Sequence, residues 1–122
     1  VLGLADDLLA GGTGLADDAL AVADAVRREH RIDNVALLAD LYHLSTNGDD
    51  LDHVLSHHTG RIGHVQIADA PGRGEPGTGT MEFARYLDTL DEAGYQGWIS
   101  LEYRQTLADP FAWLASFTNG AH

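Results

Sequence analysis

A short β-branched stretch in the middle of the chain, Ile62 to Ile67, runs directly into a loop rich in proline and glycine. Together they form the sequence RIGHVQIADAPGRGEPGTG, residues 61–79. Its polar side chains include His64, Gln66, Asp69, Arg73 and Glu75. Parallel α/β enzymes build their active sites where a buried strand ends in polar side chains and a functional loop. This stretch therefore predicts a parallel sheet with a site at the carboxyl ends of its strands.

Two other segments have the same character. The apolar run from Asn34 to Leu41 looks like a strand buried on both faces, and it ends in the sequence Asp40–Leu41–Tyr42–His43. The third strand is expected from Trp98 to Tyr103 and contains Glu102. An ionised carboxylate buried in such an apolar strand is costly unless it is paired or bound to a metal. We therefore expect Glu102 to have a functional partner.

Apolar residues at helical spacing predict four helices around these strands. The first starts at Leu15, the second follows Asp49 and Asp50 and ends at Gly60, the third is capped by Thr80 and stopped by Gly94, and the last opens at Asp109–Pro110. Their expected buried residues are, in chain order, Leu15, Ala19, Val22, Ala25 and Val26; Leu51, Val54 and Leu55; Phe83, Leu87 and Leu90; and Phe111 and Leu114. His57 and His58 are read as surface residues.

The order α-β-α-β-α-β-α implies right-handed crossovers and one parallel sheet. An eight-stranded (β/α)8 barrel takes about 250 residues, so this chain of 122 residues would supply roughly three-eighths of one. We expect residues 15–122 to be the C-terminal part of a TIM-barrel domain. Residues 1–14 are unassigned, either a short helix over Leu2 to Leu9 or the remnant of an upstream loop. The first residue is Val1, which fits clipping or processing.

Composition excludes several classes of function. The chain has no cysteine, so neither a disulfide framework nor a thiolate metal site is expected. Its net charge of −12, from seven basic and nineteen acidic residues, makes nucleic acid an unfavourable partner. No apolar run has the length needed to cross a bilayer, and no signal-peptide pattern opens the chain. We expect no membrane partner and a cytoplasmic location.

The motifs DLYH (residues 40–43), GHVQIADAPGRGEPGTG (63–79) and GWISLEY (97–103) resemble those of bacterial hydroxypyruvate isomerases, in the xylose-isomerase-like TIM-barrel superfamily. The resemblance covers residues 15 to about 117. It implies that the three strands are the sixth, seventh and eighth of the barrel. It also implies metal ligands at Asp40, Gln66 and Glu102, with Glu102 as a proton-transferring carboxylate, and substrate contacts from His43 and Arg73.

The implied reaction interconverts hydroxypyruvate and tartronate semialdehyde by moving a proton between adjacent carbons through an enediolate. A hard cation of the Mg²⁺ or Mn²⁺ type suits oxygen ligands and stabilises the developing oxyanions. Arg73 can hold a substrate carboxylate with two parallel hydrogen bonds, and Glu75 can orient that arginine or bind a hydroxyl. His64 is grouped with the substrate-binding residues, and the roles of ligand, support for a ligand and core histidine remain open for it.

The resemblance has one departure. The family's second catalytic glutamate stands at the end of the fifth strand, and no segment before Glu29 supplies it. The chain would thus carry one of the two catalytic glutamates, and the remainder of the barrel or a second chain would bring the other.

Two alternatives remain. A ketose 3-epimerase of the same superfamily would prefer histidine at position 66 and a neutral sugar. An inactive half-barrel would instead bind a partner through its open sheet edges, or self-associate through them as a homo-oligomer. Apurinic endonucleases share the superfamily fold, but the acidic charge argues against DNA.

Overall fold

The computed structural model describes residues 14–118. The elements in chain order are α1 (Leu15–His30), β1 (Leu37–Asp40), α2 (Leu41–Thr46), α3 (Leu51–His57), the 3-10 turn η1 (Thr59–Arg61), β2 (Ile62–Ile67), α4 (Phe83–Glu92), β3 (Ile99–Leu101) and α5 (Leu114–Thr118). The possible short helix near the start of the chain lies outside the described residues. None of the helices described is long and apolar enough to cross a membrane.

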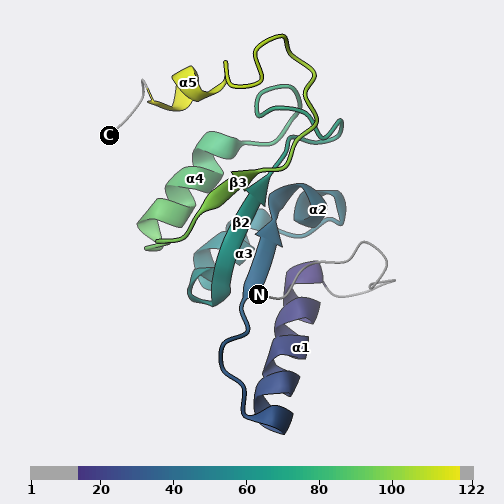
Figure 1. Cartoon of the computed structure of the whole chain (residues 1–122), viewed down its shortest axis with the longest axis vertical. Helices are drawn as coiled ribbons and strands as arrows, with labels where there is room; N and C mark the ends of the chain where they lie inside the picture. Colours follow the sequence, from purple (N-terminus) through teal and green to yellow (C-terminus); the bar gives the residue numbers. More distant parts are fainter. Residues whose placement is uncertain (1–13, 119–122) are drawn as a thin grey trace.

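The three strands form one parallel sheet in the order β1-β2-β3 (Figure 1). Asp40 of β1 pairs with Gln66 of β2, and Gln66 in turn pairs with Ser100 of β3. Strands that alternate with helices and pair in parallel confirm the predicted α/β class and its parallel sheet. The sheet therefore presents three neighbouring carboxyl ends at one edge.

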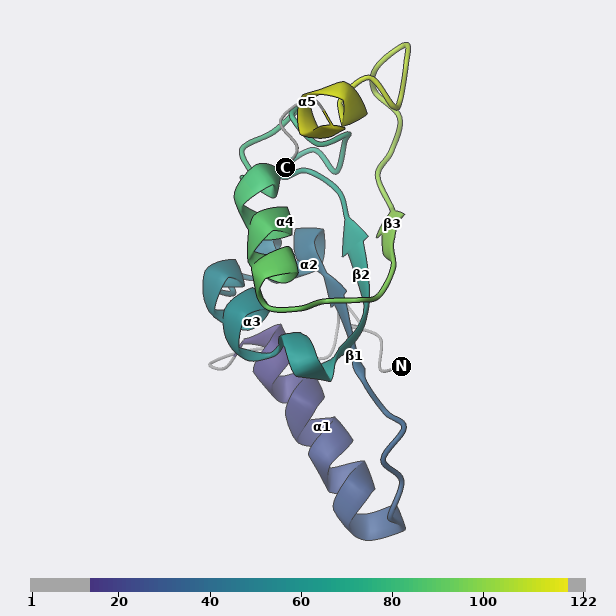
Figure 2. The ribbon, with the colours of Figure 1, turned by 90° about the vertical axis from the view of Figure 1, so that its left-hand side faces the viewer.

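Helices α1, α3 and α4 lie together on one side of the sheet (Figure 2). Between them and the strands lies a core made mainly of leucine and other aliphatic side chains, which includes Leu37, Leu41, Leu44, Leu55, Val65, Ile67, Phe83 and Leu90. The other face of the sheet is not covered by any described helix (Figure 2). At the β3 edge, Trp98 is 83% exposed and Leu101 is also exposed. The described residues thus bury one face of the sheet and leave the other open.

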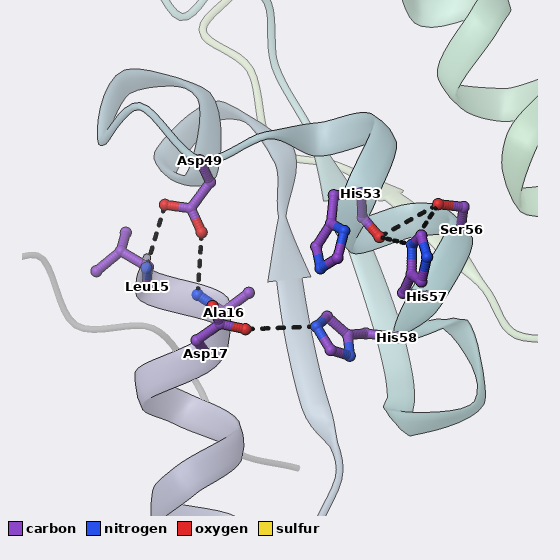
Figure 3. A network of polar contacts seen from close by, with 8 residues as sticks. All are labelled: Leu15, Ala16, Asp17, Asp49, His53, Ser56, His57 and His58. Atoms are coloured by element: carbon purple, nitrogen blue, oxygen red, sulfur yellow. Dashed lines mark hydrogen bonds and ion pairs between the residues drawn. The ribbon is translucent and has the colours of Figure 1, made fainter. Parts of the chain in front are cut away.

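The buried face of α1 agrees only in part with the one predicted. Leu15 is buried and Ala19 packs against the core, as predicted. Ala16, Leu20 and Ala23 are buried as well, whereas Val22 is 51% exposed. The first turn of α1 is held by Asp49, whose carboxylate accepts hydrogen bonds from the two amides that open the helix, each at 3.1 Å (Figure 3). This contact from the loop between α2 and α3 fixes the helix at its N-terminus, and a tertiary contact of that kind is invisible to local periodicity.

The first strand is shorter than predicted and an extra helix follows it. The run from Asn34 to Leu41 forms a strand only over Leu37–Asp40, and Leu41 begins α2. Asp40 ends the strand because its Oδ1 accepts the N–H of His43 at 3.2 Å and thereby caps the helix. Asp50 caps α3 in the same way, as predicted. Helix α3 ends at His57, and Gly60 lies in η1 rather than at the helix end.

Of the two predictions about the ends of α4, one is wrong and one is confirmed. Thr80 does not cap α4, because its amide and hydroxyl both donate to the carbonyl of Ala70, and α4 begins at Phe83. Gly94 follows the end of α4 with φ of 86°, a left-handed conformation that glycine adopts readily, which confirms the predicted stop.

The C-terminal segment also departs from the prediction. Asp109 accepts the N–H of Phe111 at 2.9 Å and forms a turn, but the helix α5 starts only at Leu114. Phe111 is 55% exposed and Leu114 is exposed too, while Trp113 and Phe117 pack partly against the core. Trp113 and Phe117, and not the predicted Phe111 and Leu114, therefore hold this segment against the core.

Candidate functional site

Asp40 and Gln66 lie side by side at the carboxyl ends of β1 and β2. They are paired in the parallel register, and paired residues of neighbouring strands project from the same face of the sheet. That face is the open one, because the alternating residues Val65 and Ile67 are buried under the helices. Asp40 is itself buried, and its Oδ2 lies 3.8 Å from Nε2 of His43. Two of the three predicted oxygen ligands are therefore neighbours.

His64 faces the same side of β2 as Gln66, one pleat earlier. Its Nε2 lies 2.8 Å from the hydroxyl of Ser100 on β3, a hydrogen bond whose direction depends on the tautomer. Ser100 was not singled out from the sequence, because a lone serine in an apolar strand carries no signal. The pair crosses from β2 to β3 directly below the strand ends, and this contact favours a supporting role for His64.

Glu102 is exposed, which corrects the prediction that it is buried within an apolar strand. The strand β3 ends at Leu101, although the amide of Glu102 still donates to the carbonyl of Ile67 at 3.0 Å. The carboxylate is uncovered because β3 is the last strand of the described sheet and has no neighbour on its far side. The backbone of Glu102 lies just past the end of β3, beside β2, and a metal ligand at the carboxyl ends of the strands would need this position.

A cavity of about 360 Å³ is lined by residues of α1, α2 and the loop after β2, and this lining includes His43 and Arg73 but not Asp40, Gln66 or Glu102. The guanidinium carbon of Arg73 lies 5.1 Å from the centre of the Tyr42 ring, within the range of a cation–π contact. Tyr42 also meets His43 edge to face, with ring centres 5.2 Å apart. The remaining lining residues are Leu15, Thr46 and Asn47. A cationic group and an imidazole in one cavity can bind an anionic ligand.

Asp69 organises the loop that carries Arg73. It is 1% exposed, and its carboxylate accepts four backbone N–H groups of the same loop. These are donated by Ala70 (2.9 Å) and Met81 (3.0 Å) to Oδ1, and by Gly77 (2.8 Å) and Gly79 (2.9 Å) to Oδ2. The sequence marked Asp69 as a polar residue at a strand end, but its role is to shape the loop.

Glu75 is completely buried and does not reach the cavity lining, contrary to its predicted contact with substrate. Its carboxylate accepts the amide of Thr106 at 2.9 Å, the hydroxyl of Thr106 at 2.5 Å and the amide of Leu107 at 3.1 Å. Burial raises the pKa of the Glu75 carboxyl, but these hydrogen bonds outweigh it and lower the pKa from 4.5 to about 2. Glu75 therefore stays ionised and joins two loops.

The histidines of α3 divide into exposed and half-buried ones. His53 and His57 stack at 4.3 Å on the exposed side of the helix, and His57 is a surface residue as predicted. The side chain of His58 is only 24% exposed, and its Nε2 lies 3.4 Å from the carboxylate of Asp17 on α1 (Figure 3). The surface prediction is wrong for His58, since α1 folds back over it.

Within residues 14–118, no group of three or more His, Cys, Asp or Glu side chains is arranged to hold a metal ion. The predicted ligand set does not fall in that class, because it consists of two carboxylates and one amide. Metal binding by Asp40, Gln66 and Glu102 thus stays a prediction.

Comparison with known proteins gives a consistent family. The profile of the xylose isomerase-like TIM barrel family matches residues 8–117. A protein of Streptomyces coelicolor named "Putative hydroxypyruvate isomerase" is 46% identical over 106 residues, which are 84% of this chain and 38% of that protein. The hydroxypyruvate isomerase of Escherichia coli is 35% identical over 71 residues, which are 58% of this chain and 28% of that enzyme. The chain thus spans less than half the length of these relatives.

Solved structures agree on the fold. The crystal structure of an AP endonuclease of family 2 from Brucella melitensis matches with a TM-score of 0.74 and 32% identity, over 84% of this chain and 39% of that one. The structure of an L-ribulose 3-epimerase matches with a TM-score of 0.65 and 28% identity, over 84% of this chain and 33% of that one.

Proposed function

The chain belongs to the xylose isomerase-like TIM barrel family, and from this premise we propose that it forms part of an isomerase acting on hydroxypyruvate. The observation that carries the proposal is the register that sets Asp40 beside Gln66 on the open face of the sheet. The cavity that holds His43 and Arg73 adds a place for an anionic substrate. Relatives named hydroxypyruvate isomerase support this substrate.

The residues at the strand ends fit a hard divalent cation such as Mg²⁺ or Mn²⁺. Asp40, Gln66 and Glu102 would hold it, since oxygen ligands are the ones that these cations prefer. The helix cap uses Oδ1 of Asp40, so Oδ2 is the oxygen that this residue can offer. When bound, the cation supplies positive charge against the oxygen atoms that become anionic in the reaction.

The chain's own residues then have distinct tasks. Arg73 binds the substrate carboxylate with two parallel hydrogen bonds, and its contact with Tyr42 limits its motion. Glu102 is one of the two carboxylates that move the proton from C3 of hydroxypyruvate to C2. The C3 hydroxyl gives up its proton as C3 becomes the aldehyde, and the C2 oxygen takes up a proton as the carbonyl becomes a hydroxyl. His43 donates to a substrate oxygen from the cavity wall. The other proton-transferring carboxylate comes from outside this chain.

The test combines calorimetry with turnover, on the protein as its source expresses it. We expect Mg²⁺ or Mn²⁺ to bind, and Glu102→Gln to weaken that binding and to abolish the conversion of hydroxypyruvate. Glu92→Gln, on an exposed residue at the end of α4, is the matched control and should change neither quantity. Absence of metal binding, or full activity in Glu102→Gln, would refute the proposal.

A sugar epimerase is the second candidate, because the L-ribulose 3-epimerase shares the fold at 28% identity. The two reactions differ in the charge of the substrate, and Arg73 favours the acid. A panel of hydroxypyruvate, 2-oxo-tetronate and ketohexoses separates them. Turnover of ketohexoses without turnover of either acid would replace the isomerase by the epimerase.

The open face and exposed edge of the sheet favour a covering partner. We propose that further strands of the same barrel cover it, since two copies of a three-stranded sheet would give six strands rather than the eight of a TIM barrel. The intact mass of the natural protein tests this directly. A mass near 13.1 kDa in a self-associated form would favour the half-barrel module instead. A cytoplasmic location stays a prediction.

A further inference from the structure

Glu75 is the most completely buried charged group among the described residues, with no exposed surface. Its partners from elsewhere in the chain are Thr106 and Leu107, in one short segment that follows β3, and both are hydrogen-bond donors. A carboxylate surrounded by donors is satisfied without a cation, whereas glutamine would turn its NH₂ toward an N–H group. The site is therefore specific for the carboxylate.

A second link joins the same two segments only two residues away. The amide of Arg104 donates to the carbonyl of Arg73 at 2.8 Å. Between the two links stands Gly74, where a Cβ would lie 2.7 Å from the Thr78 hydroxyl and 3.4 Å from Thr106. Arg73 itself has φ of 60°, in the left-handed region that non-glycine residues seldom adopt. The backbone of Arg73 is thus held from both sides in a specific conformation.

We propose that Glu75 is a positioning residue, which locks the Arg73 loop to the segment after β3 and so fixes the Arg73 guanidinium in the cavity. The proposal rests on the proposed function in that Arg73 is taken to receive the substrate carboxylate. In this role Glu75 supports Arg73, the residue that binds the substrate, and does not contact the substrate itself. These hydrogen bonds join the Arg73 loop to the segment that begins with Glu102. The backbones of Arg73 and Glu102 therefore keep a fixed position relative to one another.

A positioning role for Glu75 predicts a change in the kinetics of the folded enzyme, which burial of Glu75 alone does not. If Glu75 only filled space, its loss would lower stability and leave the kinetics of the folded enzyme unchanged. If it positions Arg73, its loss weakens substrate binding more than the chemical step, because the interaction with a carboxylate that does not react is similar in ground and transition states.

The experiment compares Glu75→Gln, Thr106→Val and Thr106→Ser with the control Glu92→Gln. Hydrogen exchange of the Thr106 and Leu107 amides is measured first, and KM and kcat for hydroxypyruvate second. In Glu75→Gln we expect exchange at these amides to accelerate about tenfold or more, since a hydrogen bond to a charged group is among the stronger ones. We expect KM to rise about tenfold with a smaller change in kcat. Thr106→Ser keeps the hydroxyl donor and should rescue what Thr106→Val loses.

The outcomes separate this inference from the proposed function. Unchanged exchange in Glu75→Gln, or an unchanged KM in an active enzyme, would overturn the lock while leaving the isomerase intact. Faster exchange in a protein that never converts hydroxypyruvate would uphold the link between the loops and refute the proposed substrate. A variant that fails to fold is replaced by Thr106→Val, whose exposed site tolerates the change, and the same two measurements decide.

Discussion

Replacing Asp69 by asparagine tests whether one side chain shapes the whole loop after β2. The carboxylate is 1% exposed and accepts four backbone N–H groups, two on each oxygen. Asparagine keeps one acceptor oxygen and turns an NH₂ group toward the other two donors, so two of the four hydrogen bonds to the buried side chain are lost. At about 1.5–3 kcal/mol for each hydrogen bond to a charged group, the expected loss is about 3–6 kcal/mol. That is a large share of the about 5–15 kcal/mol that stabilises a domain.

Two measurements on Asp69→Asn give the answer. Urea unfolding followed by tryptophan fluorescence reports the global loss, and hydrogen exchange at Gly77, Gly79 and Met81 reports opening of the loop alone. Asp33→Asn, on an exposed residue before β1, is the control and should stay within about 0.5 kcal/mol of the parent. A loss below about 1 kcal/mol together with unchanged exchange would refute the role of Asp69 as the organiser, because the loss of two hydrogen bonds to a buried carboxylate would cost more.

Three further predictions follow from the same contacts. Gly79→Ala should prevent the native loop, because its Cβ would lie 2.1 Å from the carbonyl oxygen of Ala70, whereas Gly72→Ala has open space and should be neutral in thermal unfolding. Glu75 has a pKa lowered from 4.5 to about 2, so the stability that it contributes is present above pH 4.5 and is lost as the pH falls toward 2. Glu75→Gln should therefore lower the stability at pH 7 and flatten this pH dependence. Acid titration followed by circular dichroism measures both effects. Asp49→Ala removes the cap of α1 and should cost about 0.5–2 kcal/mol in urea unfolding, and a neutral result would contradict the cap.

The sheet was predictable because its signal is local. The stretch Ile62–Ile67 is a strand with the predicted bounds, and each of the other two predicted strands contains an observed one. Boundaries failed where a side chain from the loops decided them. In the sequence, Asp40 looks like part of a strand that continues through Leu41. In the structure its carboxylate accepts the N–H of His43 and caps α2, so the strand ends at Asp40.

The sequence singled out His43 and Arg73, and the structure brings them together in one cavity. Which of the candidate residues bind a metal or a substrate stays a prediction. Asp69 and Glu75 carry the same carboxylate chemistry as Asp40, but their partners are backbone amides brought together by the folded loops. A carboxylate that binds metal and one that binds amides look alike in a sequence, since only the surroundings distinguish them.

The exposure of Glu102 has a different cause, which the alternation along the strands makes visible. Residues of β2 that face the helices, Val65 and Ile67, are aliphatic, while those on the open face, His64 and Gln66, are polar. A parallel strand buried on both faces normally reads as a continuous apolar run, so polar residues on the second face are unfavourable in a packed barrel interior. They become favourable where that interior holds water, a cation or a charged substrate. The polar face that ends at Glu102 is therefore suited to a ligand, and its uncovered state follows from the missing neighbour of β3 rather than from a preference of Glu102 for solvent.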